Sequence, residues 1–313
     1  MMKKLYILFA CILAVTVMAC GSGKNPKADV DTQGANTEVQ NTDTNGEKYE
    51  LCYKLEQGKT YSQKMSIDMN IGVSVVGQQM DMRMVTSYAM DVAVTDVTDG
   101  IFTCNSKFTE VLISIENPMM GNISYSSKDD ATNDPAVKML KAMTEGHFSM
   151  TITKYGDVTS ITGFEEMMDN TYKSMGLSAS ETAQAKAMMG QSFSEDKMME
   201  QMQNMAIYPD YPVAIGDSWK MAVKTSQMEM DNTYTLKEVT ADEFVIAVDS
   251  DVKAGSMEGF DGTVEGTQTG TNVVHRSSGW IKSAELKQDI AGSGKIQGMD
   301  GKMTLKSTIT IEE

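Results

Sequence analysis

The chain has 313 residues and is strongly acidic, with 43 acidic against 27 basic residues and a net charge of −16. Only two of the basic residues are arginines, Arg83 and Arg276. A nucleic-acid surface needs a positive patch that displaces counterions from phosphate, so this composition argues against nucleic-acid binding.

The first segment has the features of an export signal. Lys3 and Lys4 precede an apolar run from Leu5 to Ala19, which is too short to cross a bilayer but has the length of a secretory signal. The run ends V-M-A-C at Cys20, which resembles the lipobox of bacterial lipoproteins, where the cysteine is lipidated. We therefore expect residues 1–19 to be a lipoprotein signal peptide, the alternative being an ordinary secreted protein with an incidental cysteine.

Residues 20–48 are expected to form a lipidated, disordered tether. They contain no aromatic residue and almost no large aliphatic one, so they cannot bury enough apolar surface to offset the entropy of ordering. Residue 21 is glycine, not the aspartate that the lipoprotein resemblance associates with retention in the inner membrane. The resemblance thus implies an outer-membrane protein facing the periplasm, with surface exposure left open.

Residues 49–313 are expected to form a single β-rich domain. Apolar residues alternate with polar ones from Met65 to Val75 and again from Met80 to Val94, with a turn between, which is typical of a long hairpin with one apolar face. Long antiparallel strands of this kind tend to curl around a core. The glycine-spaced stretch GFDGTVEGTQTG, residues 259–270, is expected at hairpin turns.

Two segments change to helical spacing. DPAVKMLKAM at 134–143 predicts a helix with proline in its first turn, and a helical insert is expected at about 164–206. The predicted fold class is therefore α+β: mostly antiparallel, long curved strands in an incomplete barrel or half-barrel, with a helical cover. Similar turn and tyrosine patterns after GKTY at 58–61 and GDSW at 216–219 leave two pseudo-repeats as an open alternative.

Three passages carry a family resemblance. YELCYKLEQGKTYSQKM, YPDYPVAIGDSWK and GTNVVHRSSGWIKSAELKQDIAG resemble a family of uncharacterised bacterial lipoproteins with a domain of unknown function. The chain is more loosely similar to the incomplete β-barrels of periplasmic lipid and lipoprotein carriers. The shared motifs are turns with no catalytic signature, so the resemblance implies no activity.

Cys52 and Cys104 remain after lipidation of Cys20, and in an oxidising envelope they are a candidate disulfide. The alternative is two buried, unpaired thiols. The two histidines, His147 and His275, are far apart in sequence and form no zinc motif. We therefore expect no catalytic residue, no metal site, no cofactor and no enzymatic activity.

Methionine replaces leucine in this sequence. The chain after residue 19 keeps 26 methionines but only eight leucines, although leucine is among the commonest residues in ordinary proteins. Three interpretations stay open: filling of the core, lining of an adaptable apolar cavity, and Cu(I) binding or oxidant scavenging by thioethers. The residues expected to line such a cavity are Met80, Met82, Met84, Tyr88, Met90, Met198, Met202 and Met205.

The sequence therefore predicts a membrane-anchored, non-enzymatic envelope lipoprotein. Its expected partners are the membrane, through the N-terminal lipid, and a hydrophobic or acyl-chain ligand held between the strands of 65–94 and helices of 164–206. The alternative is a structural or interaction lipoprotein with a fully packed core, whose partner is another envelope protein.

Overall fold

The computed structural model of the chain describes residues 46–118, 121–130, 133–176, 178–189, 195–202, 206–224, 228–256, 260–296 and 298–313. The expected signal peptide, Cys20, the tether as far as residue 45, and Met205 lie outside these residues. Among the helices that the structure describes, none combines the length and apolar character needed to cross a bilayer.

Strands dominate the fold, and many of them are long. In chain order the elements are β1 (Lys48–Tyr49), β2 (Thr60–Val75), β3 (Gln78–Thr98), β4 (Ile101–Asn117), β5 (Gly121–Ser126), α2 (Pro135–Glu145), β6 (Phe148–Thr153), β7 (Val158–Thr162), α3 (Phe164–Ser174), α4 (Ala179–Met189), α5 (Glu195–Met202), β8 (Val213–Ala214), β9 (Ser218–Lys224), β10 (Met228–Val239), β11 (Glu243–Ala254), β12 (Phe260–His275), β13 (Ile281–Ile296) and β14 (Met299–Glu312).

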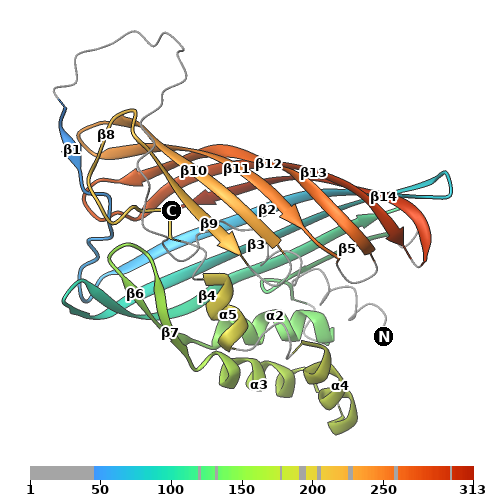
Figure 1. The fold of residues 1–313 in the computed structure, drawn as a ribbon. Coiled ribbons are helices and arrows are strands. Elements are labelled where there is room, and N and C mark those ends of the chain that lie inside the picture. The colour runs from blue at the N-terminus through green and yellow to red at the C-terminus, as the bar shows by residue number, and fades with distance from the viewer. Residues whose placement is uncertain are drawn as a thin grey trace.

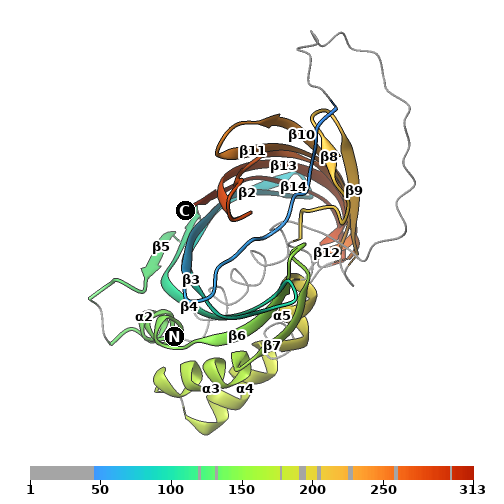
Figure 2. The same cartoon turned by 90° about the vertical axis from the view of Figure 1, so that its left-hand side faces the viewer.

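One antiparallel sheet of 12 strands organises the molecule. Its strands run in the order β7-β6-β4-β3-β2-β14-β13-β12-β11-β10-β9, with β5 paired beside part of β4, while β1 and β8 pair separately. The last strand, β14, pairs with β2, so strands from the beginning and the end of the domain lie side by side in the middle of the sheet. The sheet curves strongly, and seen along its long axis it forms an arch (Figure 2).

The long hairpin predicted at 65–94 is confirmed as β2 and β3, which pair over 16 positions from Thr60 with Ala93 to Val75 with Gln78. The prediction for the glycine-spaced stretch is wrong, because Gly262, Gly266 and Gly270 lie inside β12 and face the inside of the arch. A β-carbon at Gly266 would lie 2.1 Å from the carbonyl oxygen of Asp289 on the next strand, so glycine permits a closer approach of β12 and β13 than any other residue would.

The predicted fold class is corrected. The structure contains 63% strand and 14% helix, which makes it a mostly antiparallel β protein and not an α+β protein with a helical cover. The helices in the described residues are 8 to 11 residues long and pack at the β4–β7 end of the sheet (Figure 1). Helices this short cannot span a sheet built from strands of up to 21 residues.

Helix α2 begins as the sequence predicts. The Asp134 carboxylate accepts a hydrogen bond from the Ala136 N–H at 2.8 Å, and Pro135 occupies the first turn, where it has no hydrogen bond to lose. A chain of aromatic contacts then joins the helices to the sheet, because Phe164 of α3 packs edge-on against Phe148 of β6, with ring centroids 5.6 Å apart. The helices therefore stabilise one end of the sheet.

Candidate functional site

The inner face of the arch is ordered in rows. Residues that pair directly across neighbouring strands stack into lines that run from β10 through β14 to β2, β3 and β4. Each row holds one inward side chain per strand. The side chains of a row therefore determine how polar the inner face is at that position along the strands.

One of these rows is polar and fully buried. It crosses five adjacent strands and consists of Asn232, Ser250, Gln268, Gln288 and Ser307, which are between 1% and 6% exposed. We call these five residues the polar row. The alternating pattern of these strands would place apolar residues at these five positions, so the polar side chains there are unexpected.

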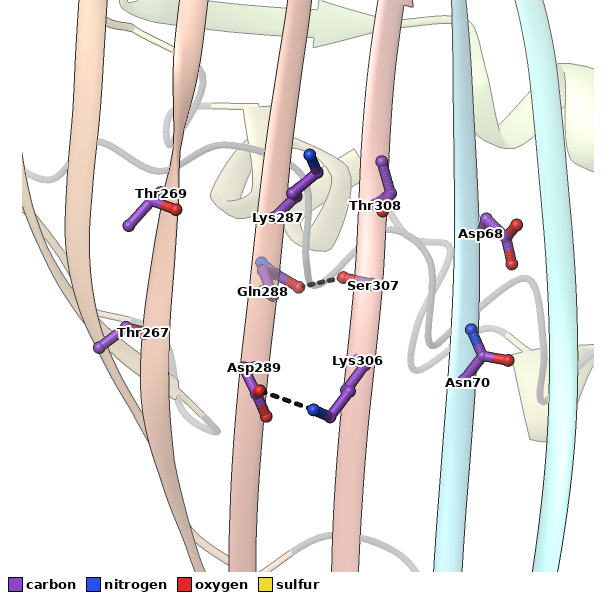
Figure 3. Close-up of a pocket in the computed structure, with 10 residues that line it drawn as sticks. All are labelled: Asp68, Asn70, Thr267, Thr269, Lys287, Gln288, Asp289, Lys306, Ser307 and Thr308. Atoms are coloured by element: carbon purple, nitrogen blue, oxygen red, sulfur yellow. Dashed lines mark hydrogen bonds and ion pairs between the residues drawn. The ribbon is translucent and has the colours of Figure 1, made fainter.

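Hydrogen bonds run through the whole polar row. The Ser250 hydroxyl donates to Asn232 Oδ1 at 2.6 Å, and Gln268 Nε2 lies 3.5 Å from the Ser250 Oγ that accepts from it. Gln288 Nε2 donates to Gln268 Oε1 at 2.8 Å. The Ser307 hydroxyl donates to Gln288 Oε1 at 2.7 Å (Figure 3). Because a buried amide or hydroxyl is costly only when it lacks a partner, the continuous chain of bonds makes this polar row tolerable inside the sheet.

The same line continues as methionine. Ser307 pairs with Met69, Met69 with Met84, and Met84 with Ile115, and these three apolar side chains are at most 1% exposed. Met84, expected to line a cavity, is thus part of the packed core. Met90 is also buried, at 8% exposure.

Tyr88 differs from its methionine neighbours because it is half-buried and its hydroxyl donates to the sulfur of Met65 at 3.1 Å. The other expected lining residues lie elsewhere. Met198 is buried and Met202 half-buried on α5, which packs against β7, three strands away from β3 in the sheet order. Among the residues that the structure describes, the two expected sets of lining residues are therefore not brought together as a wall and its cover.

Towards the hairpin ends the inner face remains apolar but becomes accessible. Met82 and Met303 are half-buried, and Met80 is 45% exposed. At this end Gly262, Gly294 and Gly301 are cross-strand neighbours on β12, β13 and β14, so three inner positions in a row carry no side chain. The residues of this open apolar end are Ile71, Val73, Val75, Met80, Met82, Gly262, Gly292, Gly294, Ile296, Gly301 and Met303.

The outer face of the sheet is polar and charged. Lys306 and Asp289 form an ion pair at 2.9 Å, one position along the strands from the Gln288–Ser307 pair, and both line a shallow hollow of about 330 Å³ (Figure 3). Arg83 contacts Asp68 at 2.7 Å and Glu116 at 3.2 Å, and its hydrogen bond lowers the pKa of the Asp68 carboxyl below its ordinary value. Exposed pairs of this kind contribute little to stability, so we interpret this face as a solvated surface.

Some buried polar atoms on the sheet have no partner among the described residues. Both side-chain amide atoms of Asn272 and the hydroxyl oxygens of Thr86 and Ser106 make no hydrogen bond, although Asn272 and Ser106 are 0% exposed. Asn272 lies in a row with Ile246, Ala284 and others, where its neighbours are apolar. The missing hydrogen bonds make these positions unfavourable for polar side chains in the interior of the sheet.

Cys52 and Cys104 are free, buried thiols. Cys104 lies on β4, whereas Cys52 lies in an irregular segment before β2. Burial raises the pKa of Cys104 to about 11, so its thiol is inert at neutral pH. Within the described part of the chain no cluster of three or more histidine, cysteine, aspartate or glutamate side chains is arranged to hold a metal ion.

Sequence reasoning missed the polar row. The signal was present, because Gln288 alternates in phase with Leu286 and Ile290, which must face the core. A polar residue in an apolar phase predicts a buried hydrogen-bonding partner on each neighbouring strand. The partner strands, however, become known only with the register.

A protein family of unknown function matches more than half of the chain. The family described as "Family of unknown function (DUF6263)" matches residues 99–281. No curated protein matches the sequence. Among solved structures, lipovitellin, described in a study of its lipid–protein interactions, aligns with a TM-score of 0.46 and 9% identity over 82% of this chain. The chain spans only 25% of the lipovitellin chain.

An outer membrane channel from Pseudomonas putida F1 aligns with a TM-score of 0.21 and 7% identity, covering 88% of this chain and 99% of the channel. OmpF of Salmonella typhi, in complex with daunomycin, aligns with a TM-score of 0.18 and 6% identity, covering 80% of this chain and 98% of that one.

Proposed function

The chain belongs to the family of unknown function DUF6263, and from this premise we propose that it is a non-catalytic envelope lipoprotein that binds an acyl chain at the open apolar end of its sheet. The observation that carries this proposal is the change along the inner face. At the polar row the side chains are sealed, whereas Met82, Met303 and Met80 are increasingly accessible and still apolar. Accessible, inward-facing apolar surface of this kind favours an apolar ligand.

Methionine suits this role. Its unbranched, polarisable side chain adapts to ligands of different shape, and each methylene of a bound chain contributes about 0.8 kcal/mol when it leaves water. The three adjacent inner glycines leave room for a ligand beside the backbone of β12–β14. The ligand would therefore occupy the end of the arch and not its packed centre.

Binding can be tested with a fluorescent fatty acid titrated into the purified chain. Met82→Glu places a charge on the open apolar end and should abolish saturable binding, because an unpaired carboxylate is strongly disfavoured in apolar surroundings. Gln79→Glu adds the same charge to the opposite face of β3 and should leave binding unchanged. Equal affinities for the wild type and both variants would remove the proposal.

The anchor is tested separately, with metabolic labelling by an alkyne fatty acid. The wild-type chain should incorporate the label into the peptide that begins at Cys20, and Cys20→Ala should incorporate none. Membrane fractionation then shows whether the labelled protein is in the outer membrane, as proposed. A labelled chain recovered with the inner membrane would contradict this location.

The sealed centre favours a second candidate function. Met69, Met84 and the five residues of the polar row are at most 6% exposed, as expected if the sheet is a scaffold for an envelope assembly. A scaffold should yield one stoichiometric protein after crosslinking in cells and should bind no fatty acid. Saturable fatty-acid binding without such a partner would exclude it.

A further inference from the structure

The turn between β2 and β3 carries an apolar residue in an unfavourable conformation. Val76 has a φ of 49° and is 78% exposed, and Gly77 follows it with a φ of 76°. Two-residue hairpin turns with positive φ at both positions favour asparagine, aspartate or glycine, whereas a β-branched side chain clashes with its own backbone there. The chain shows the favourable solution at the next hairpin, where Asp99 and Gly100 have φ values of 51° and 76°.

Neither folding nor solubility explains Val76. An aspartate or asparagine would relieve the backbone strain and interact better with water, yet the turn presents a valine to solvent. Strain of this kind commonly coincides with function. The side chain is therefore best explained by an apolar environment outside the molecule.

Two more apolar side chains extend the same end of the sheet. Met80 is 45% exposed and Met299 is 47% exposed. The register places them together, because Gly301, two residues after Met299, pairs with Val75, and Met80 pairs with Val73. We call Val76, Met80 and Met299 the apolar tip.

The apolar tip adjoins the open apolar end, and the β2–β3 hairpin that carries Val76 and Met80 projects beyond the other strands at the end of the molecule far from β1 (Figure 1). After the β2–β3 turn the exposed side chains are the uncharged amides Gln78 and Gln79, and the first carboxylate is Asp81. On β14 the exposed Asp300 follows Met299 directly and pairs across the strands with Lys295. An apolar point bordered by amides and then by charges of both signs matches the change from acyl chains to head groups across a lipid surface.

A tip of three side chains is too small for a specific protein interface, which buries roughly 800 Å² on each partner. A bilayer requires far less contact if the chain is already held at its surface, because tethering raises the effective concentration. The segment from residue 20 to β1 contains 28 residues and reaches at most about 95 Å, whereas β2, with its 16 residues, is about 53 Å long. A lipid on Cys20 therefore allows the far tip to touch the same membrane.

We propose that the apolar tip inserts into the leaflet that holds the Cys20 lipid and thereby directs the open apolar end of the sheet at the bilayer. This inference rests on the proposed anchor and deepens the proposed ligand binding, since an acyl chain then enters directly from the membrane. The source of the ligand is the bilayer and not free fatty acid in solution.

Methionine oxidation provides the test, since Met80 and Met299 report on their own surroundings. The full chain is reconstituted in phosphatidylcholine vesicles and treated with hydrogen peroxide, and sulfoxide formation is followed by peptide mass spectrometry. Both methionines should oxidise several-fold more slowly with vesicles than without them. Met221, which is half-buried on β9, is the internal reference and should not change.

Val76→Asn is the decisive variant, because it suits the turn and removes the apolar side chain. The variant should stay folded and lose the protection of Met80 and Met299. Unchanged protection in the variant, or equal oxidation of the wild type with and without vesicles, would overturn the proposal. Protection in cells that is absent in vesicles would assign the tip to a protein partner instead and would also overturn it.

Lipidation of Cys20 is measured independently, from the mass of the N-terminal peptide. If that peptide carries no lipid, the anchor proposal fails, and the oxidation experiment is repeated with Cys20 coupled to a maleimide lipid in the vesicles. Protection under these conditions would support the tip alone, whereas its absence would reject the tip as well.

Discussion

Asn272→Leu should stabilise the protein, although it removes an amide from the inside of the sheet. Asn272 is 0% exposed, and neither its Oδ1 nor its Nδ2 has a hydrogen-bond partner in the described structure. A buried polar group without a partner costs about 1–3 kcal/mol, and leucine has nearly the same shape as asparagine. With allowance for imperfect packing, we expect a gain of about 2 kcal/mol.

Asn232→Leu is the matched control, because the same substitution should have the opposite effect there. Asn232 is 1% exposed, but its Oδ1 accepts a hydrogen bond from the Ser250 hydroxyl at 2.6 Å. Removal of the amide leaves that hydroxyl buried and without its acceptor, which should cost about 1–3 kcal/mol. The two variants thus share their chemistry and differ only in whether the amide is hydrogen-bonded.

Urea denaturation measures both variants through the fluorescence of Trp219 and Trp280, which are buried in the native protein. Stability changes appear as shifts of the midpoint at constant slope. An Asn272→Leu variant that is less stable than the wild type would refute the reasoning. It would mean that an ordered water or ligand satisfies the amide, and the inner face beside Asn272 would then be accessible.

Three further predictions concern the sheet and its core. Gln288→Leu removes a donor and an acceptor from the polar row and should cost about 2–4 kcal/mol in the same urea assay. Gly266→Ala should be strongly destabilising, because its β-carbon would lie 2.1 Å from a carbonyl oxygen of β13, whereas Gly255→Ala, with nothing within 4 Å, should be tolerated. The pKa of Cys104 is raised by burial to about 11 from an ordinary value of about 8.5. The Cys104 thiol therefore ionises at lower pH in the unfolded chain than in the folded one, which favours unfolding. The free energy of unfolding of the wild type should fall relative to that of Cys104→Ala as pH rises from about 8.5 to about 11.

The sequence predicts the hairpin of β2 and β3 because strict alternation from Met65 to Val94 has one physical solution, a strand pair with one buried face. It cannot predict how far that face is covered. Met84 and Met80 belong to the same apolar stripe, yet one is sealed and the other is 45% exposed. Position along the arch decides this difference, and that position depends on pairings between β2, β14 and β13 that are distant in sequence.

Two expectations from the sequence, the helical cover and the glycine turns, are wrong because both depend on contacts between distant segments. Helical spacing at 164–206 identifies helices correctly but carries no information about which strands they contact, and they pack at the β4–β7 end. The spacing of the glycines at 262, 266 and 270 predicts turns, whereas these residues allow the close approach of β12 to β13. In both cases the deciding interaction is between segments, and single-segment patterns do not contain it.

We expect the arch to be packed at its centre and to receive an acyl chain only at the open apolar end. Photocrosslinking in cells with a diazirine fatty acid separates these two regions of the inner face. Mass spectrometry should locate the adducts on Met80, Met82, Val73 and their neighbours at the open apolar end, and none on Met69 or Met84. Adducts at the centre of the sheet, or no adducts on the protein at all, would contradict the account.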